Sequence, residues 1–342
     1  MTQTRIGSTR TETDSLGELA IPADALWGIQ TQRAVDNFPV SRWTMPRAFL
    51  RALGLLKASC AEANATLGAM PKARAKAIRV AASRVAKGEF DHAFPVDVFQ
   101  TGSGTSSNMN ANEVIARLAS QALGQTVHAN DDVNMAQSSN DVIPSCIQVA
   151  AVLECSVRLR PALVHLRQTI ERRARELAKI AKTGRTHLMD AMPLRFDQEL
   201  GAWATQLSEV EARLADALKR TRQLPIGGTA IGTGINAPKR FGGEVCKALK
   251  AQTGVAFAAH RDRFYGIASQ DAAVELSGVL RSAAIVLTKI ANDLRWMNSG
   301  PLAGLGEIEL PALQPGSSIM PGKVNPVIPE SAAMVAAQVI GC

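Results

Sequence analysis

The sequence predicts a mainly α-helical protein, in which a long antiparallel helical bundle follows a smaller, mostly helical N-terminal domain. Three long segments carry apolar residues at steps of three and four, the spacing of a buried stripe on a helix. Only 4% of the 342 residues are aromatic, and the apolar bulk is Ala, Leu, Val and Ile. This balance favours helices packed on helices over a β-sandwich. The length exceeds that of a usual single core, so more than one domain is expected.

The N-terminal part is expected to be irregular up to about Pro46, with one or two short strands near residues 17–21. Helices are predicted next over residues 47–67 and 71–87. Pro71 suits the first turn of the second helix, because proline lacks only a hydrogen bond that this turn does not make, and Gly88 ends the helix. We expect an N-terminal lyase-type domain over residues 1–132 and the central bundle over residues 133–342.

Three apolar stripes define the bundle. The first consists of Leu163, Leu166, Ile170, Ala174 and Leu177. The second consists of Leu200, Trp203, Leu207, Val210, Leu214 and Leu218, and the third of Val279, Ala283, Val286, Ile290, Leu294 and Met297. Helices of this kind must bury their stripes on one another, so we interpret every one of these residues as core.

Charge and cysteine content narrow the class of protein. The formal net charge is +8, but the 38 basic residues are spread among acids and accompany no nucleic-acid motif, so no nucleic-acid partner is expected. A basic balance also suits an enzyme that handles small dianions. The five cysteines are scattered without a Cys-x-x-Cys pair, which is typical of reduced thiols. Residues 1–14 are too polar for a secretory signal and no apolar run is long enough to span a membrane, so we expect a cytoplasmic protein without a membrane partner.

Residues 101–110, Thr-Gly-Ser-Gly-Thr-Ser-Ser-Asn-Met-Asn, run into a predicted helix. Two glycines and small polar side chains expose backbone N–H groups before a helix N-terminus, where a carboxylate can bind through hydrogen bonds and the helix dipole. Such sequences are also common helix caps, so either interpretation holds for this segment alone.

Residues 128–134, His-Ala-Asn-Asp-Asp-Val-Asn, lead to Ser138-Ser139-Asn140-Asp141 ahead of a long helix. This density of polar side chains exceeds what a single N-cap requires. The structural alternative is a turn followed by a cap.

Residues 182–190 connect the first two bundle helices and contain His187, one of five histidines. At a joint between helices His187 can face a cavity, and histidine exchanges protons near neutrality. The alternative is a buried histidine that is satisfied by Asp190 or by the backbone.

Residues 316–326, Gly-Ser-Ser-Ile-Met-Pro-Gly-Lys-Val-Asn-Pro, precede Glu330 at a new helix start. Two glycines predict a mobile loop, in which Lys323 supplies positive charge and Asn325 an amide donor. A serine hydroxyl acts as a base only where donors and charge stabilise its alkoxide, and this loop offers both. Glu330 could alternatively be a first-turn acid that favours the helix dipole.

The string at residues 316–326 resembles the signature of the fumarase/aspartase superfamily, which also contains argininosuccinate and adenylosuccinate lyases. The other three segments match in the same order, and the likeness runs from about residue 14 to residue 341. Within the superfamily, class II fumarases are the most similar. The residues that carry this closer likeness are Ser138-Ser139-Asn140, Gly184-Arg185-Thr186-His187 and Gly227-Gly228-Thr229-Ala230.

The resemblance implies a bundle of the fumarase/aspartase type and a carbon–oxygen lyase that adds water to fumarate to give L-malate in the tricarboxylic acid cycle. It implies the catalytic residues Ser317, His187, Glu330 and Lys323. Ser317 would remove the proton next to a carboxylate and give a carbanion held as an aci-carboxylate. His187, oriented by Glu330, would manage the leaving hydroxyl. Whether Ser317 or His187 takes the proton stays open.

The resemblance also implies the substrate-binding residues Ser103, Gly104, Thr105, Ser138, Ser139, Asn140, Thr186, Ser318, Val324 and Asn325. A secondary dicarboxylate site would consist of His128, Ala129, Asn130 and Asp131. No metal or organic cofactor is implied. The implied partners are a small dicarboxylate and further copies of the chain, in a homotetramer whose sites are each shared by three subunits.

Several positions depart from the family pattern. Family chains continue beyond Cys342 with more bundle helix and a small C-terminal domain, so the resemblance implies an incomplete bundle without that domain. Residues 327–330 are closer to aspartases, Asp197 stands where glycine is usual, and Gln125-Thr126 replace the basic residues that often precede the secondary site. Two alternatives therefore remain: an aspartate ammonia-lyase, and an inactive or structural homologue.

Overall fold

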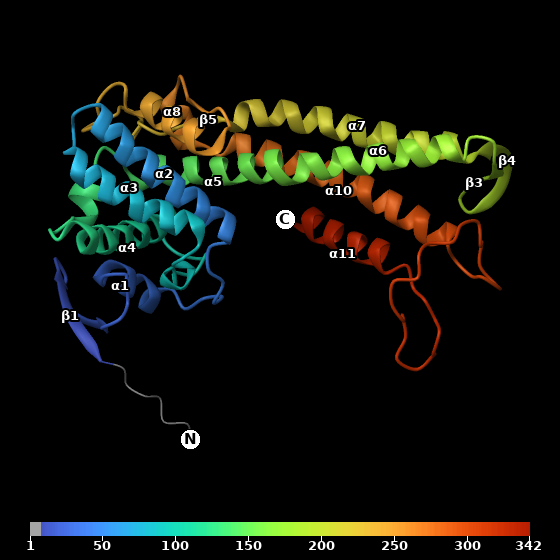
Figure 1. Ribbon diagram of the computed structural model, residues 1–342, viewed down its shortest axis with the longest axis horizontal. Coiled ribbons are helices and arrows are strands. Elements are labelled where there is room, and N and C mark those ends of the chain that lie inside the picture. The colour runs from blue at the N-terminus through green and yellow to red at the C-terminus, as the bar shows by residue number, and fades with distance from the viewer. Residues whose placement is uncertain (1–7) are drawn as a thin grey trace. The chain divides into compact units, whose positions relative to one another are not determined.

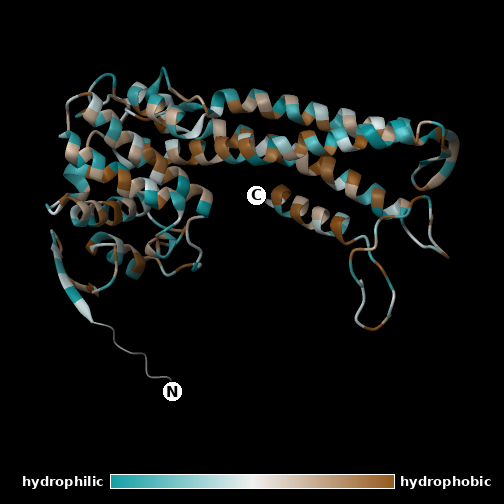
Figure 2. Cartoon of the chain, viewed as in Figure 1, coloured by the Kyte–Doolittle hydropathy of each residue, from teal (hydrophilic) through white to brown (hydrophobic). Residues whose placement is uncertain are grey.

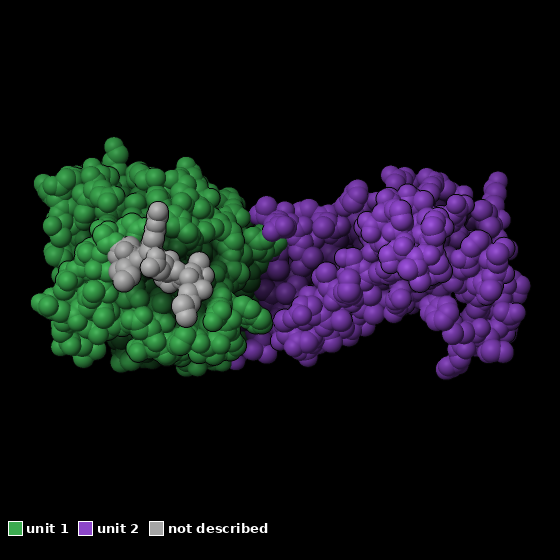
Figure 3. All heavy atoms as spheres, turned by 90° about the horizontal axis from the view of Figure 1, so that it is seen from below, with its two compact units in different colours: residues 1–154, 221–270 green, residues 155–220, 271–342 purple. Residues whose placement is uncertain are grey.

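In a computed structural model that describes residues 8–342, the chain is mainly α-helical, as the sequence predicts (Figure 1). Residues 1–7, half of the polar segment that we interpret as non-secretory, lie outside the described range. The chain forms two compact units (Figure 3). Unit 1 contains the described part of Met1–Glu154 together with Thr221–Gln270, and unit 2 contains Cys155–Arg220 and Asp271–Cys342.

The predicted boundary between residues 132 and 133 does not coincide with this division. Helix α5 (Ser139–Glu154) packs against α2 (Arg47–Thr66) and therefore belongs to unit 1. Helix α8 (Phe241–Thr253) also packs against α2, which returns the chain to unit 1 after residue 220. The domain boundary itself stays a prediction.

Unit 1 begins with the antiparallel hairpin of β1 (Thr9–Asp14) and β2 (Gly17–Pro22), where short strands are expected. Its helices surround α2, whose Leu53 and Leu56 are fully buried. The remaining elements in order are α1 (Ile29–Asn37), α3 (Lys72–Lys87), η1 (Asp91–Ala93), α4 (Thr105–Leu123), η2 (Ala129–Val133), β5 (Gln223–Leu224), β6 (Ala258–Ala259) and α9 (Arg263–Ala268).

The two helices predicted before residue 88 are confirmed as α2 and α3. Gly88 ends α3 in the left-handed conformation, with φ of 89°, which glycine adopts without steric cost. Gly54 lets α2 and α3 approach closely, because an added Cβ at this position would lie 2.6 Å from the backbone nitrogen of Ala86.

Unit 2 contains the long helices that the apolar stripes predict. They are α6 (Arg160–Glu176), α7 (Phe196–Thr221) and α10 (Asp271–Met297), with η3 (Cys155–Leu159) before α6 and α11 (Val327–Gly341) after α10. An ion pair between Arg167 and Glu211 joins α6 to α7. The Trp203 indole of α7 donates to Asp293 of α10 at 3.2 Å. Asp197 lies in the first turn of α7, where it pairs with Arg195 and suits the helix dipole.

The interpretation of every stripe residue as core is correct for α7 and wrong for part of α6 and α10. All six stripe residues of α7 are buried. In contrast, the following stripe residues are only half-buried: Leu166, Leu177, Val279, Val286 and Leu294. The neighbouring helices of unit 2 cover only part of the apolar surface of α6 and α10.

Apolar surface also extends along α11, most of which is coloured as hydrophobic in Figure 2. Only Ala336 of this helix is buried. Four large apolar side chains of α11 are exposed: Ile328, Met334, Val335 and Ile340.

One helical stretch meets the length and composition of a membrane span, contrary to the sequence-based expectation that no apolar run is long enough. It is the continuous helix from Ser139 to Glu176. Since 56% of its most apolar window is buried inside the protein, and a core helix passes the same test, we assign this window to the protein core.

Candidate active site

The segment of residues 316–326 forms a loop that is closed at its neck. The backbone N–H of Gly316 donates to the Lys323 carbonyl at 2.8 Å, and Asn325 Nδ2 donates to the Gly316 carbonyl at 3.1 Å. Pro315 and Val324 form an isolated bridge beside these bonds. These bonds hold the two ends of the loop together. They therefore fix the positions from which Ser317, Ser318 and Lys323 extend.

The hydroxyl oxygen of Ser317 accepts two backbone N–H groups inside this loop. They come from Ile319 at 3.3 Å and from Met320 at 3.2 Å. Donors that point at an oxygen stabilise negative charge on it, which lowers the free energy of an alkoxide. These two bonds supply the donors that a serine base requires, and the role of Ser317 as a base stays a prediction.

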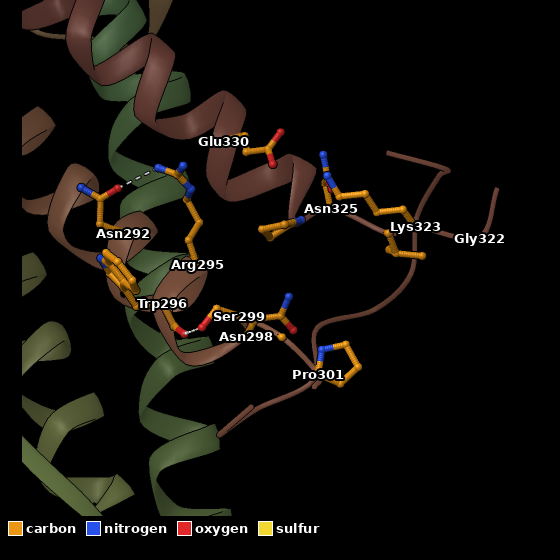
Figure 4. Close-up of a pocket in the computed structure, with 13 residues that line it drawn as sticks. Asn292, Arg295, Trp296, Asn298, Ser299, Pro301, Gly322, Lys323, Asn325 and Glu330 are labelled. Carbon is orange, nitrogen blue, oxygen red and sulfur yellow. Dashed lines mark hydrogen bonds between the residues drawn. The ribbon is translucent and has the colours of Figure 1, made fainter. Parts of the chain in front are cut away.

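A cavity of about 780 Å³ lies beside the neck of the loop (Figure 4). Lys323, Val324 and Asn325 line it from the loop, and Glu330 lines it from the first turn of α11. The opposite wall carries Arg295 of α10, whose guanidinium donates to Asn292 at 3.0 Å. Two cationic side chains beside one carboxylate favour a small anion in this cavity.

Arg295 was missed at the sequence level. It lies in the last turn of α10, where a basic residue is the ordinary complement of the helix dipole. Its only sequence signal is its position next to the Gly- and Ser-containing segment that follows α10.

Thr186 and His187 lie at the tip of a β-hairpin formed by β3 (Ala181–Thr186) and β4 (Met189–Arg195). Thr186 pairs with Met189, so His187 and Leu188 make a two-residue turn. Their φ angles are 51° and 64°, and positive φ at both positions is the type I′ turn that suits a hairpin. The predicted connection between the bundle helices α6 and α7 is therefore a β-hairpin, and His187 lies in its turn.

An ion-pair network fixes this hairpin to the rest of unit 2. Lys182 pairs with Glu199 of α7 and with Glu307 at 3.1 Å, and Arg185 pairs with Glu307 at 2.9 Å. The Lys182 and Glu307 side chains are only 6% and 12% exposed, so solvent screens this pair weakly. Neither residue was singled out from the sequence, because the contact between them spans more than 100 positions.

His187 and Glu330 lie in separate cavities of the chain. His187 lines a cavity of about 510 Å³ together with Lys182, Arg185 and other residues, whereas Glu330 lines the cavity beside the loop. Within residues 8–342 no hydrogen bond or ion pair joins the two side chains. The implied pairing of His187 with Glu330 therefore stays a prediction.

In unit 1, the first polar segment caps helix α4. Gly104 occupies the N-cap with φ of 68°, and an added Cβ would lie 3.0 Å from the Ile143 side chain, so the position requires glycine. The hydroxyls of Ser103 and Thr105 lie 2.8 Å apart and both residues are exposed. These hydroxyls are available to a ligand at the helix N-terminus.

The start of α5 lies next to α4 and carries Ser138, Ser139 and Asn140. Asn108 of α4 donates to the Ser139 hydroxyl oxygen at 3.2 Å. Asn140 donates from its side chain to the Ala230 carbonyl at 2.8 Å, and its backbone N–H donates to Ser138 Oγ at 3.2 Å. The two polar segments of unit 1 thus form one surface.

Asp141 anchors this surface from inside unit 1. One carboxylate oxygen accepts the Ser138 N–H, and the other accepts the N–H groups of Gly227 and Thr229, each at 2.9 Å. Burial raises the pKa of Asp141, and the three backbone donors oppose that rise. Asp141 thereby connects the start of α5 to residues 227–229.

The residues of the implied secondary site lie on one turn. His128 precedes η2, which contains Ala129, Asn130 and Asp131, and all but the half-buried Ala129 are exposed. Asp132 closes the turn: it accepts the His128 N–H at 2.8 Å and pairs with Arg74 at 2.8 Å. The dicarboxylate role of this turn stays a prediction.

Across residues 8–342, no group of three or more His, Cys, Asp or Glu side chains is arranged to hold a metal ion. The functional side chains described above are hydroxyls, amides, one imidazole, one carboxylate and two cations. These groups suit proton transfer and the binding of a small anion.

Comparisons with known proteins show the family of the chain. A lyase family model matches residues 17–341. The class II fumarate hydratase of Xylella fastidiosa is 62% identical over 97% of this chain and 70% of its own length. A second one, from Pseudomonas aeruginosa, is 60% identical over 97% of this chain and 73% of its own length.

Among solved structures, the class II fumarase of Schistosoma mansoni matches with a TM-score of 0.94 and 37% identity, over 98% of this chain and 74% of that one. The family model covers nearly the whole chain, and the two relatives are at least 60% identical to it. These matches assign the chain to one family. The chain belongs to the lyase family and, within it, to the class II fumarate hydratases.

Proposed function

We propose that this protein is a fumarate hydratase, which interconverts fumarate and L-malate by reversible anti addition of water. Membership in the class II fumarate hydratase family supports this activity. The single observation that carries it is the pair of backbone N–H groups at Ser317 Oγ, in the same loop as Lys323. The reaction needs both a base for a weakly acidic C–H and a site for accumulating negative charge.

In the direction from malate, Ser317 takes a proton from the carbon next to one carboxylate. The electron pair of the broken C–H bond moves into that carboxylate and forms an aci-carboxylate dianion. The C–O bond to the hydroxyl then breaks as the pair returns to form the double bond, and His187 supplies a proton to the departing hydroxide. Hydration of fumarate follows the same steps in reverse.

Stabilisation of the dianion is the larger requirement, and each preorganised donor to it lowers the barrier by about 3–4 kcal/mol. Lys323 and Asn325 supply such groups from unit 2, and Thr186 supplies a hydroxyl at the hairpin. Thr105 and residues 138–140 supply further donors from unit 1. Ser103, Gly104, Ser318 and Val324 complete the proposed substrate contacts.

These groups serve one substrate if several copies of the chain contribute to each site. The separate cavities of His187 and Glu330 support this arrangement. We therefore infer a homotetramer with each site shared by three subunits, in which Glu330 of one copy orients His187 of another. The five cysteines form no disulfide within residues 8–342, which supports a cytoplasmic location, where the enzyme would serve the tricarboxylic acid cycle.

The activity is tested by following fumarate absorbance with the purified protein, first alone and then with ammonium. Loss of fumarate without ammonium is the expected result. Loss that requires ammonium would make the protein an aspartate ammonia-lyase, as the aspartase-like residues 327–330 allow. Loss under neither condition would favour the inactive or structural homologue.

The role of Ser317 is tested separately by Ser317→Ala. Removal of the base should lower kcat by about a thousandfold or more, because general-base catalysis contributes on that order. Ser208→Ala is a matched control, since Ser208 is an exposed serine of α7. Near-normal turnover of Ser317→Ala would transfer the role of base to another group.

A further inference from the structure

A lysine is buried beneath the polar surface of unit 1. Lys57 of α2 has an exposed fraction of 0%, and its ammonium donates to Asn134 Oδ1 at 3.1 Å and to Gln137 Oε1 at 2.9 Å. An ammonium has donors only, so the carbonyl oxygens of both amides must face it. The Gln137 NH₂ group consequently points to the carbonyls of Val133 and Met135, which fixes the chain just before Ser138.

A connected series of hydrogen bonds runs from Lys57 through Asn134 and Asn108 to Ser139, and each bond sets which atom donates in the next. Asn134 Oδ1, which faces Lys57, also accepts Asn108 Nδ2 at 3.1 Å. The same Asn108 NH₂ group donates to Ser139 Oγ at 3.2 Å. Ser139 is therefore an acceptor on its protein side, which leaves its hydroxyl hydrogen to be donated elsewhere.

The Asn108 amide can in principle take two orientations, and its bond to the Asn134 oxygen, which faces Lys57, selects one of them. In the described part of the chain, Asn108 Oδ1 is buried and has no hydrogen-bond partner. A flip of this amide would give Oδ1 the Ser139 hydroxyl as donor, but it would leave the buried NH₂ group in the position where Oδ1 has no partner. It would also place two carbonyl oxygens against each other at Asn134, and Lys57 holds the Asn134 oxygen in place.

We propose that Lys57 is a positioning residue which, through Asn134 and Asn108, holds the Ser139 hydroxyl as a hydrogen-bond donor to a substrate carboxylate. The inference rests on the proposed function, because that function gives Ser139 its contact with a dicarboxylate. It adds three residues to the site that do not touch the substrate: Lys57, Asn134 and Asn108.

A purely structural role fits Lys57 poorly. Burial of an ammonium opposes folding, and an apolar side chain of similar length fills the same space without that cost. Burial lowers the pKa of Lys57 to about 8. The ionisable groups that face it are Cys60 on its own helix and Asp141 and Cys146 on α5. Burial raises the pKa of both thiols, so neither ionises near pH 8.

The test compares Lys57→Met with the wild type and with Lys247→Met, which removes an exposed lysine of α8 in the same unit. Two quantities are measured: the affinity for succinate, a dicarboxylate that cannot react, by calorimetry, and the kinetics of fumarate hydration. Lys57→Met should weaken succinate binding and raise KM by about tenfold and should lower kcat as well, because Ser139 donates both to the bound carboxylate and to the dianion formed from it. Lys247→Met should match the wild type.

Asn134→Ala removes the side chain that joins Lys57 to Asn108. If Lys57→Met fails to fold, the same two measurements are made on Asn134→Ala instead. The double variant should bind succinate no more weakly than either single variant, since both changes break one connected path. Above pH 8 the wild type should lose succinate affinity, because a neutral amine accepts as well as donates and no longer fixes the amides. Lys57→Met should show no such loss.

The outcomes separate this inference from the proposed function. An active wild type whose succinate affinity and KM are unchanged by Lys57→Met would overturn the inference and leave the function intact. An inactive wild type that binds succinate in a Lys57-dependent manner would support the inference and overturn the function. A wild type that binds no succinate would overturn the inference, because the anion site would not exist.

Discussion

At the scale of single residues, the neck of the catalytic loop leaves no room for a side chain at Gly316. An added Cβ would lie 2.5 Å from Asn325 Cγ and 2.8 Å from its backbone nitrogen. Gly316→Ala should therefore break the bond between Asn325 and Gly316 and displace Ser317 from its productive position. We expect kcat/KM for fumarate to fall by about a hundredfold, since misplacement by about 1 Å has that effect.

The same substitution should leave the free energy of unfolding within about 0.5 kcal/mol, because the loop is largely exposed. Steady-state kinetics and urea denaturation measure the two effects. Gly278→Ala is the control, since a Cβ there meets open space in α10. Full activity of Gly316→Ala would mean that the neck does not position the loop.

Single residues also mark the limit of what the sequence predicts about the site. Gly104, Ser139 and Ser317 lie in short polar segments whose capping and loop chemistry is local, so their positions follow from neighbouring residues. Lys57 and Glu307 act through partners 77 and 125 positions away in the chain, and no local pattern records such contacts.

At the scale of elements, the hairpin β3–β4 depends on its ion-pair network for its position. Glu307 accepts both Lys182 and Arg185, so Glu307→Gln removes the carboxylate that the two cations share and leaves Lys182 with Glu199 alone. We expect the free energy of unfolding to fall by about 2–3 kcal/mol, somewhat below the loss for a fully buried pair. Turnover should fall as well, because the hairpin carries His187. Urea denaturation with enzyme kinetics measures both.

Glu209→Gln provides the matched control for this network. Glu209 pairs with Arg213 on the exposed face of α7, with side chains 62% and 52% exposed. Exposed pairs contribute about 0–1 kcal/mol, so this variant should be nearly indistinguishable from the wild type. Equal effects of the two substitutions would show that the network under the hairpin has no special contribution.

The elements themselves were predictable to different degrees. Helices α2, α3, α6, α7 and α10 follow from apolar periodicity, which depends only on residues within a few turns. The hairpin was not predicted, because His187-Leu188 lacks the Asn-Gly signal of a type I′ turn. The return of residues 221–270 to unit 1 was also missed, since it depends on the packing of α8 against α2.

At the scale of the whole molecule, the surfaces of unit 2 favour self-association. Met334 and Val335 of α11 are 69% and 61% exposed, and the apolar stripe of α10 is only partly covered. Exposed apolar surface of this extent marks a protein interface. The proposed homotetramer would cover it.

This arrangement makes a prediction about mixtures of inactive variants. Ser317→Ala and His187→Asn should each abolish hydration. If Ser317 and His187 of one site come from different subunits, a tetramer assembled from both variants contains some sites with neither substitution. Random assembly of equal amounts should restore about a quarter of wild-type activity, because each of the two positions is intact with a probability of one half.

The experiment requires co-expression or refolding of the two variants together, followed by the fumarate assay on the separated tetramer. Each variant assembled alone is the control and should stay inactive. A site built within one chain predicts no recovery at any mixing ratio, because every chain then carries one defect. Recovery near a quarter would place His187 and Ser317 of each site on different chains, as the proposed homotetramer with shared sites requires.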